Sequence, residues 1–141
     1  MNIYIIAAYS AAPRVRALHA RLRDLGHEPT SSWAEHADGP EPIGGYSESG
    51  AILEANTAAL TSSDGAIVLA DTPMREGWCE VARLSEQRVC VVGPSNLTTR
   101  AHGWDHVADD AAALAWAHGY APCPVCGRAR ECGYHVGEDR R

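Results

Sequence analysis

Phenylalanine is absent from this chain of 141 residues, and most of its apolar residues are Ala, Val, Leu and Ile. No apolar run is long enough to cross a membrane. The start of the chain, Met1 to Ile6, lacks the basic segment and the long apolar stretch of a signal peptide. We therefore expect a cytoplasmic protein with no membrane partner.

Basic residues are also in short supply. Eighteen acidic residues against twelve basic ones give a formal net charge of −6. This balance argues against a nucleic-acid partner, because such partners are held through their phosphates. A small phosphorylated substrate is still compatible with the sequence, since a local site can be positive on an acidic protein.

Internal repeats and low-complexity tracts are missing as well, and the length suits one domain with a core. Short apolar runs alternate with segments of helical spacing, which predicts an α/β fold with a parallel sheet and right-handed crossovers. We expect a domain over residues 1–119, with a polar loop at 34–46, and a separate tail over 120–141. The expected strands are 2–8, 27–33, 65–70, 87–93 and 104–107, and the expected helices are 14–25, 47–63, 77–86 and 109–118.

The segment around Glu80 is the most informative part of the chain. Gly65 to Ala70 is an apolar run typical of a buried strand, and a loop closed by Gly77 leads into a helix with Glu80 in its first turn. Unpaired N–H groups and the helix dipole would keep such a carboxylate ionised. An ionised carboxylate near a strand end is well placed to act as a nucleophile. The alternative is that Glu80 only caps its helix.

Three segments occur in a fixed order: a strand and loop from Ile3 to Ser10, a helix and strand from Asn56 to Val68, and Gly-x-x-Glu from Gly77 to Glu80. With the strand that ends at Gly93, they resemble the nucleoside 2-deoxyribosyltransferase-like family, which includes the 2-deoxynucleoside 5-monophosphate N-hydrolases. The resemblance covers residues 1–119. It implies a flavodoxin/Rossmann-like parallel sheet, a site at the carboxyl ends of the strands, and a homo-oligomer.

The resemblance also implies a reaction, cleavage of the N-glycosidic bond of a (deoxy)nucleoside or its 5-monophosphate. Glu80 matches the family nucleophile, which forms a glycosyl-enzyme ester that water hydrolyses or a second base takes over. Tyr4 matches a tyrosine that orients this nucleophile, although a strand tyrosine can equally pack in the core.

One position departs from the family. Asn56 stands where the family usually has an Asp that helps to hold the substrate and can take part in proton transfer. An amide cannot supply a proton at neutral pH, so another group protonates the leaving base or the activity is lost. Asp71 at a strand end is one substitute, and His36 on the long loop is another. Alternatively, Asp71 is only a turn residue, and His36 is only a solvated histidine at the surface.

Residues after the first strand are candidates for substrate binding. Tyr9, Ser10 and Arg14 offer backbone N–H groups, a hydroxyl and a guanidinium for a 5-phosphate. Trp33 can stack on a base or serve as a structural tryptophan, and the resemblance places Gly77 at the substrate. The loop lacks the glycines of a dinucleotide fingerprint, so we reject a nicotinamide or flavin dinucleotide, and we expect no cofactor for catalysis.

The tail is rich in cysteine. Cys123, Cys126, Cys132 and His135 form two short-spaced pairs that predict one structural zinc with four protein ligands. The alternatives are free thiols and disulfides. Cys79 and Cys90 lie outside the tail, in a predicted helix and a predicted strand where buried free thiols are ordinary.

Three functions are therefore compared. The first is an N-glycosidase or deoxyribosyltransferase that acts on a small nucleoside or nucleotide. The second is a nucleotide-binding protein that kept the pocket but lost turnover, and Asn56 favours it. The third is a protein-docking module built on the zinc tail, and the short tail counts against it.

Overall fold

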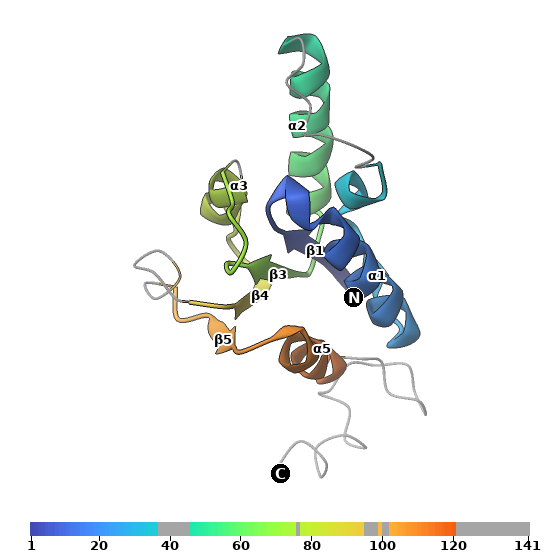
Figure 1. The fold of residues 1–141 in the computed structure, drawn as a ribbon, viewed down its shortest axis with the longest axis vertical. Coiled ribbons are helices and arrows are strands. Elements are labelled where there is room, and N and C mark those ends of the chain that lie inside the picture. Colours follow the sequence, from blue (N-terminus) through green and yellow to red (C-terminus); the bar gives the residue numbers. More distant parts are fainter. Residues whose placement is uncertain (37–45, 76, 95–98, 100–101, 121–141) are drawn as a thin grey trace.

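The computed structural model describes residues 1–36, 46–75, 77–94, 99 and 102–120. Strands and helices alternate along most of these residues (Figure 1). The strands are β1 (Asn2–Ile6), β2 (Glu28–Pro29), β3 (Gly65–Leu69), β4 (Arg88–Val92) and β5 (Asp105–Val107). The α-helices are α1 (Ala12–Asp24), α2 (Tyr46–Thr61), α3 (Gly77–Arg83) and α5 (Asp110–His118), and the 3-10 helices are η1 (Tyr9–Ala11) and η2 (Ser32–His36).

The five strands form one parallel sheet in the order β2-β1-β3-β4-β5. Figure 1 shows α2 and α3 on one face of the sheet and α1 and α5 on the other. The expected α/β fold is thus confirmed, and its strand order is that of flavodoxin-like proteins. The order reverses between β1 and β3, and ligands of such sheets bind at this switch point, outside the carboxyl ends of the strands.

Side chains of β1 alternate between two cores, because successive residues of a strand point to opposite faces. Ile3 and Ile5 pack in the core that includes residues of α1 and α5. Tyr4 and Ile6 pack in the opposite core, with Leu60 of α2 and Val81 of α3. The sequence of β1 therefore directs the Tyr4 side chain toward the α2 and α3 layer.

The expected strand at 27–33 is wrong over most of its length. Only Glu28 and Pro29 pair with β1, and a 3-10 helix then contains Trp33. Pro29 has no N–H to donate to a ladder, which weakens pairing at this edge. The indole Nε1–H of Trp33 instead donates to the carbonyl of Ile5 at 3.2 Å. A side chain thus replaces the missing strand pairing.

Smaller differences concern element ends. The first strand ends at Ile6, and α3 ends at Arg83. Helix α1 begins at Ala12, two residues earlier than expected, with a proline in its first turn. The structure describes part of the expected loop at 34–46. Residues 34–36 belong to η2, and α2 begins at Tyr46. Residues 37–45 lie outside the described residues. Within the described part of the chain, no helix is both long and apolar enough to span a membrane.

Candidate functional site

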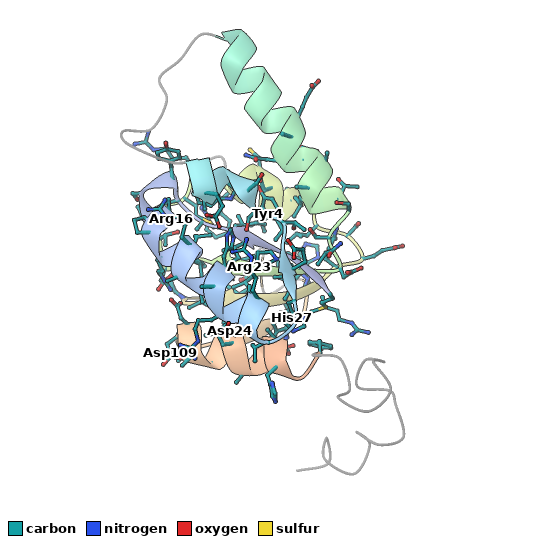
Figure 2. All side chains as sticks on the ribbon, turned by 90° about the vertical axis from the view of Figure 1, so that its right-hand side faces the viewer. Tyr4, Arg16, Arg23, Asp24, His27 and Asp109 are labelled. Atoms are coloured by element: carbon teal, nitrogen blue, oxygen red, sulfur yellow. The ribbon has the colours of Figure 1, made fainter. Side chains whose placement is uncertain are left out.

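Tyr4 and Glu80 are far apart in the sequence but in direct contact in the structure. The Tyr4 hydroxyl donates to Glu80 Oε2 at 2.6 Å. Tyr4 is completely buried on β1, whereas Glu80 is half-buried on α3. Figure 2 shows Tyr4 in the interior of the molecule, below the long helix α2. The contact joins the middle of the sheet to the first turn of the covering helix.

Burial dominates the protonation of this pair. It raises the pKa of Glu80, while the hydrogen bond from Tyr4 and the positive charge of Arg83 lower it. The Tyr4 pKa is raised by burial first and then by the charge and hydrogen bond of Glu80, so Tyr4 keeps its proton at neutral pH. The sequence argument for an ionised Glu80 counted only the helix start, and the burial of the charge acts in the opposite direction.

Gly77 brings α3 close to the sheet. It is buried at the first position of α3, and a Cβ there would lie 3.0 Å from Met74 Sδ and 3.3 Å from Ile6 Cγ2. Such a contact is tighter than ordinary packing, so a side chain would push the helix start away from β1. The structure thus gives Gly77 a packing role, and its predicted contact with substrate stays a prediction.

Asn56 lies on α2, which packs against α3. It is half-buried, and the next residue, Thr57, accepts a hydrogen bond from Arg83 Nη1 at 3.2 Å. Arg83 is one helical turn after Glu80, so this bond ties the two helices together beside the Tyr4–Glu80 pair. The role of Asn56 at a leaving base stays a prediction.

Arg14 lies between two carboxylates. Its Nη1 and Nη2 donate to Asp71 Oδ1 and Oδ2, both at 3.0 Å, and its Nε and Nη2 donate to Asp110 Oδ2 and Oδ1 at 2.9 and 2.6 Å. The hydrogen bonding that Arg14 donates to Asp110 is the largest cause that raises the pKa of Arg14 above its usual value. We call Arg14, Asp71 and Asp110 the arginine clamp.

The clamp joins three elements at the carboxyl edge of the sheet. Arg14 is in the first turn of α1, Asp71 follows β3, and Asp110 opens α5. The backbone of Gly93, just after β4, lies close to Asp71. Its φ is +104°, and a Cβ there would lie 2.8 Å from the Asp71 backbone N, so only glycine fits this position. Both carboxylate oxygens of Asp71 accept from Arg14, so Asp71 can donate a proton only after this pair opens. Its predicted role as a proton donor stays a prediction.

Thr72 is a residue that sequence reasoning missed. Its Oγ1 accepts from the backbone N–H of Ala8 at 3.0 Å and donates to the carbonyl of Leu69 at 2.6 Å. These bonds connect the segments that follow β1 and β3, where the strand order reverses. The only signal in the sequence is a hydroxyl residue shortly after an apolar strand, which is too common to identify such a bridge.

Two of the predicted substrate-binding residues contact each other. The rings of Tyr9 and Trp33 stack with centroids 6.4 Å apart and planes at 28°. Both side chains are half-buried, and Ser10 is exposed in the same 3-10 turn as Tyr9. The contact and the Trp33 hydrogen bond to Ile5 support a structural use of Trp33, while stacking on a base stays a prediction.

Sequence reasoning also missed a second network of polar side chains. His19 is buried on α1, with Nε2 2.6 Å from Ser31 Oγ and Nδ1 2.8 Å from Glu35 Oε1. The arrangement resembles a Ser-His-Glu triad, but Ser31 has no exposed surface and so cannot reach a substrate. The network instead fixes η2 on α1. The signal in the sequence was a histidine on the apolar face of α1.

The described residues do not include the predicted zinc ligands. Cys123, Cys126, Cys132 and His135 all lie in 121–141, outside the described part. Within that part, no group of three or more His, Cys, Asp or Glu side chains is placed to hold a metal ion. Cys90 is buried as expected, but Cys79 is exposed, because its position on the short helix α3 faces away from the sheet.

The comparisons with known proteins agree with this fold. A solved structure described as a 2-deoxyribosyltransferase from the psychrotolerant bacterium Bacillus psychrosaccharolyticus superimposes with a TM-score of 0.60. The alignment covers 81% of this chain and 90% of that chain, with 14% sequence identity. That protein is characterised as a biocatalyst for the synthesis of nucleosides. No family model and no curated protein matches the sequence. The chain therefore shares the fold of that structure, and at this identity the likeness shows the fold alone.

Proposed function

We propose that this protein cleaves the N-glycosidic bond of a (deoxy)nucleoside or its 5-monophosphate, with Glu80 as the nucleophile. The observation that carries the proposal is the 2.6 Å hydrogen bond from the Tyr4 hydroxyl to Glu80 Oε2. It lies on the α2 and α3 face of the strand next to the switch point of the sheet. The sequence resemblance and the fold of the transferase structure support the same chemistry.

The reaction would run in two steps. In the first, a carboxylate oxygen of Glu80 attacks the anomeric carbon, the bond from that carbon to the base nitrogen breaks, and its electron pair leaves with the base. In the second, water or another base attacks the same carbon and releases the Glu80 carboxylate. Attack by water makes the enzyme a hydrolase, and attack by a second base makes it a transferase. Two inversions preserve the configuration of the sugar.

Tyr4 would position the nucleophile. Its bond to Oε2 fixes the rotation of the carboxylate, so the other oxygen can be aimed at the sugar. Burial raises the pKa of Glu80, which makes its oxygens more basic, and the Tyr4 bond and the charge of Arg83 counteract part of this rise. The pair thus combines a reactive carboxylate with a group that favours its ionised form.

The departing base needs a proton or a hydrogen bond on its ring. Asn56 can offer an N–H hydrogen bond but no proton at neutral pH. Asp71 and His36 are the other candidates, and Asp71 must first leave the arginine clamp. Bases that leave as weakly basic anions or that protonate readily in water should therefore be the best substrates.

The test is base release. The protein is incubated with a panel of nucleosides and 5-monophosphates, and free base is measured by chromatography, with and without a second base as acceptor. Release that disappears in Glu80→Gln supports the proposal. Tight binding of substrates without any release would favour the non-catalytic alternative, in which Asn56 marks a lost proton donor. Restoring the carboxyl with Asn56→Asp should then create measurable release.

A further inference from the structure

We propose that the arginine clamp makes the site selective for a nucleoside without a 5-phosphate. The inference rests on the proposed function and concerns its substrate class. Arg14 is the cationic residue among the three that the sequence offered for a 5-phosphate, and in the structure two carboxylates already bind its guanidinium. Asp71 and Asp110 are thus specificity-determining residues.

The hydrogen bonds of Arg14 show why a phosphate would be excluded. All three nitrogens of the guanidinium donate to carboxylate oxygens, in one bidentate pair with Asp71 and another with Asp110. A phosphate is recognised through the same planar donor geometry. The bonds to Asp71 and Asp110 use four of the five guanidinium N–H groups, so a phosphate could be held bidentately only by displacing a carboxylate, which would then lie unpaired beside it.

The local charge points the same way. Two carboxylates against one guanidinium give the clamp a net charge of −1 when all three groups are ionised. About two thirds of each side chain is covered, with exposed fractions of 31% for Arg14, 38% for Asp71 and 33% for Asp110. A monophosphate brings roughly 1.5 to 2 further negative charges at neutral pH. Partial burial weakens the screening of this repulsion by salt.

The clamp is also where a phosphate would be expected in this fold. The first turn of α1 follows the carboxyl end of β1, and such helix starts bind phosphate through their N–H groups. Here Asp71 and Asp110 lie against that turn through Arg14. A 5-hydroxyl, in contrast, is neutral and can donate a hydrogen bond to a carboxylate oxygen.

The experiment compares one 2-deoxynucleoside with its 5-monophosphate. Binding is measured by calorimetry on Glu80→Gln, and kcat/KM for base release is measured on the unmodified protein. We expect the nucleoside to be preferred in both measurements by about tenfold or more. Asp110→Asn frees part of Arg14 and removes a negative charge, so it should lower this preference about tenfold.

The matched control is Asp24→Asn. Figure 2 shows Asp24 on α1 below Arg23, with Arg16 higher on the same helix, toward its start. The control makes the same change of charge on an exposed residue at the last position of α1, and it should leave the preference unchanged. If Asp110→Asn does not fold, Asp110→Glu, which keeps the charge and displaces the carboxylate, takes its place, and it should lower the preference to a smaller extent.

The outcomes separate the two proposals. Preference for the monophosphate, or an equal shift in Asp24→Asn and Asp110→Asn, overturns the selectivity. A nucleoside that binds more tightly but never releases its base overturns the proposed reaction and leaves the selectivity standing. A protein that binds neither compound overturns both.

Discussion

The Tyr4–Glu80 pair and the arginine clamp use carboxylates in opposite ways. Glu80 is half-buried, its hydrogen bond comes from a neutral hydroxyl, and burial raises its pKa. Asp71 and Asp110 are each paired bidentately with Arg14, at the more exposed edge of the sheet. The Tyr4 bond and the charge of Arg83 offset only part of the cost of burying ionised Glu80, which suits a group that must react. Asp71 and Asp110 instead share one guanidinium through two hydrogen bonds each, which suits groups that hold elements together.

This difference separates reactivity from stability. Removing the charge of Glu80 relieves a burial cost, because ionised carboxylates are disfavoured where solvent is excluded. Removing Arg14 leaves two carboxylates without their partner. Substitutions at the first site should therefore affect turnover most, and substitutions at the second should affect unfolding most.

Glu80→Gln should lower the rate of base release by about a thousandfold or more, because the covalent route is lost. The same variant should keep its fold, and its melting temperature at neutral pH should equal or exceed that of the unmodified protein. The reason is the sign of the pKa shift: a raised pKa means that the folded state favours the protonated, neutral form, so ionised Glu80 costs stability above that pKa. Thermal unfolding and chromatography measure the two quantities. Near-normal release by the folded variant would contradict the assignment.

Tyr4→Phe should lower kcat by roughly ten- to a hundredfold, because the nucleophile loses the bond that orients it. It should also move the acid limb of the pH–rate profile to higher pH. The Tyr4 hydrogen bond lowers the pKa of Glu80. Loss of this bond therefore raises that pKa, and the carboxylate ionises only at a higher pH. A lower kcat with an unmoved acid limb would mean that Tyr4 acts only through packing.

Arg14→Met should destabilise the folded protein by ~2 kcal/mol, because Asp71 and Asp110 lose their shared partner. Denaturant unfolding measures this loss. The double variant with Asp110→Asn should recover part of it, since one of the two unpaired charges is removed. If Arg14→Met unfolds like the unmodified protein, the clamp is not a stabilising element.

Glu35→Gln should have the smallest effect, and only above acidic pH. The hydrogen bond from His19 is the main cause that lowers the pKa of Glu35, so the ionised form stabilises the fold above the usual glutamate pKa. This contribution is lost as the pH falls through the lowered pKa. Because the Glu35 side chain is partly exposed, with an exposed fraction of 38%, we expect less than about 1 kcal/mol. Unfolding curves of the two proteins should differ at neutral pH and converge at the acid end.

Sequence patterns predicted the sheet and its helices because apolar runs and helical spacing are local signals. They failed at 27–33, where Pro29 and a side-chain hydrogen bond from Trp33 replaced strand pairing. The contact between Tyr4 and Glu80 was implied by the family resemblance, and spacing alone could not have found it. The arginine clamp was not predicted, because Arg14, Asp71 and Asp110 come from three distant segments. Contacts between distant segments and the cost of burying a charge depend on how the chain packs, so local sequence patterns do not predict them.

The formation of a glycosyl ester on Glu80 is the most direct test of the central claim. The protein is mixed with a nucleoside from which it releases the base, and the reaction is quenched in acid within the first turnover. The protein is then digested and examined by mass spectrometry. We expect the peptide that contains Glu80 to gain the mass of the sugar residue, and we expect no such gain in Glu80→Gln. Base release without this adduct, at turnover rates that Glu80→Gln retains, would contradict it.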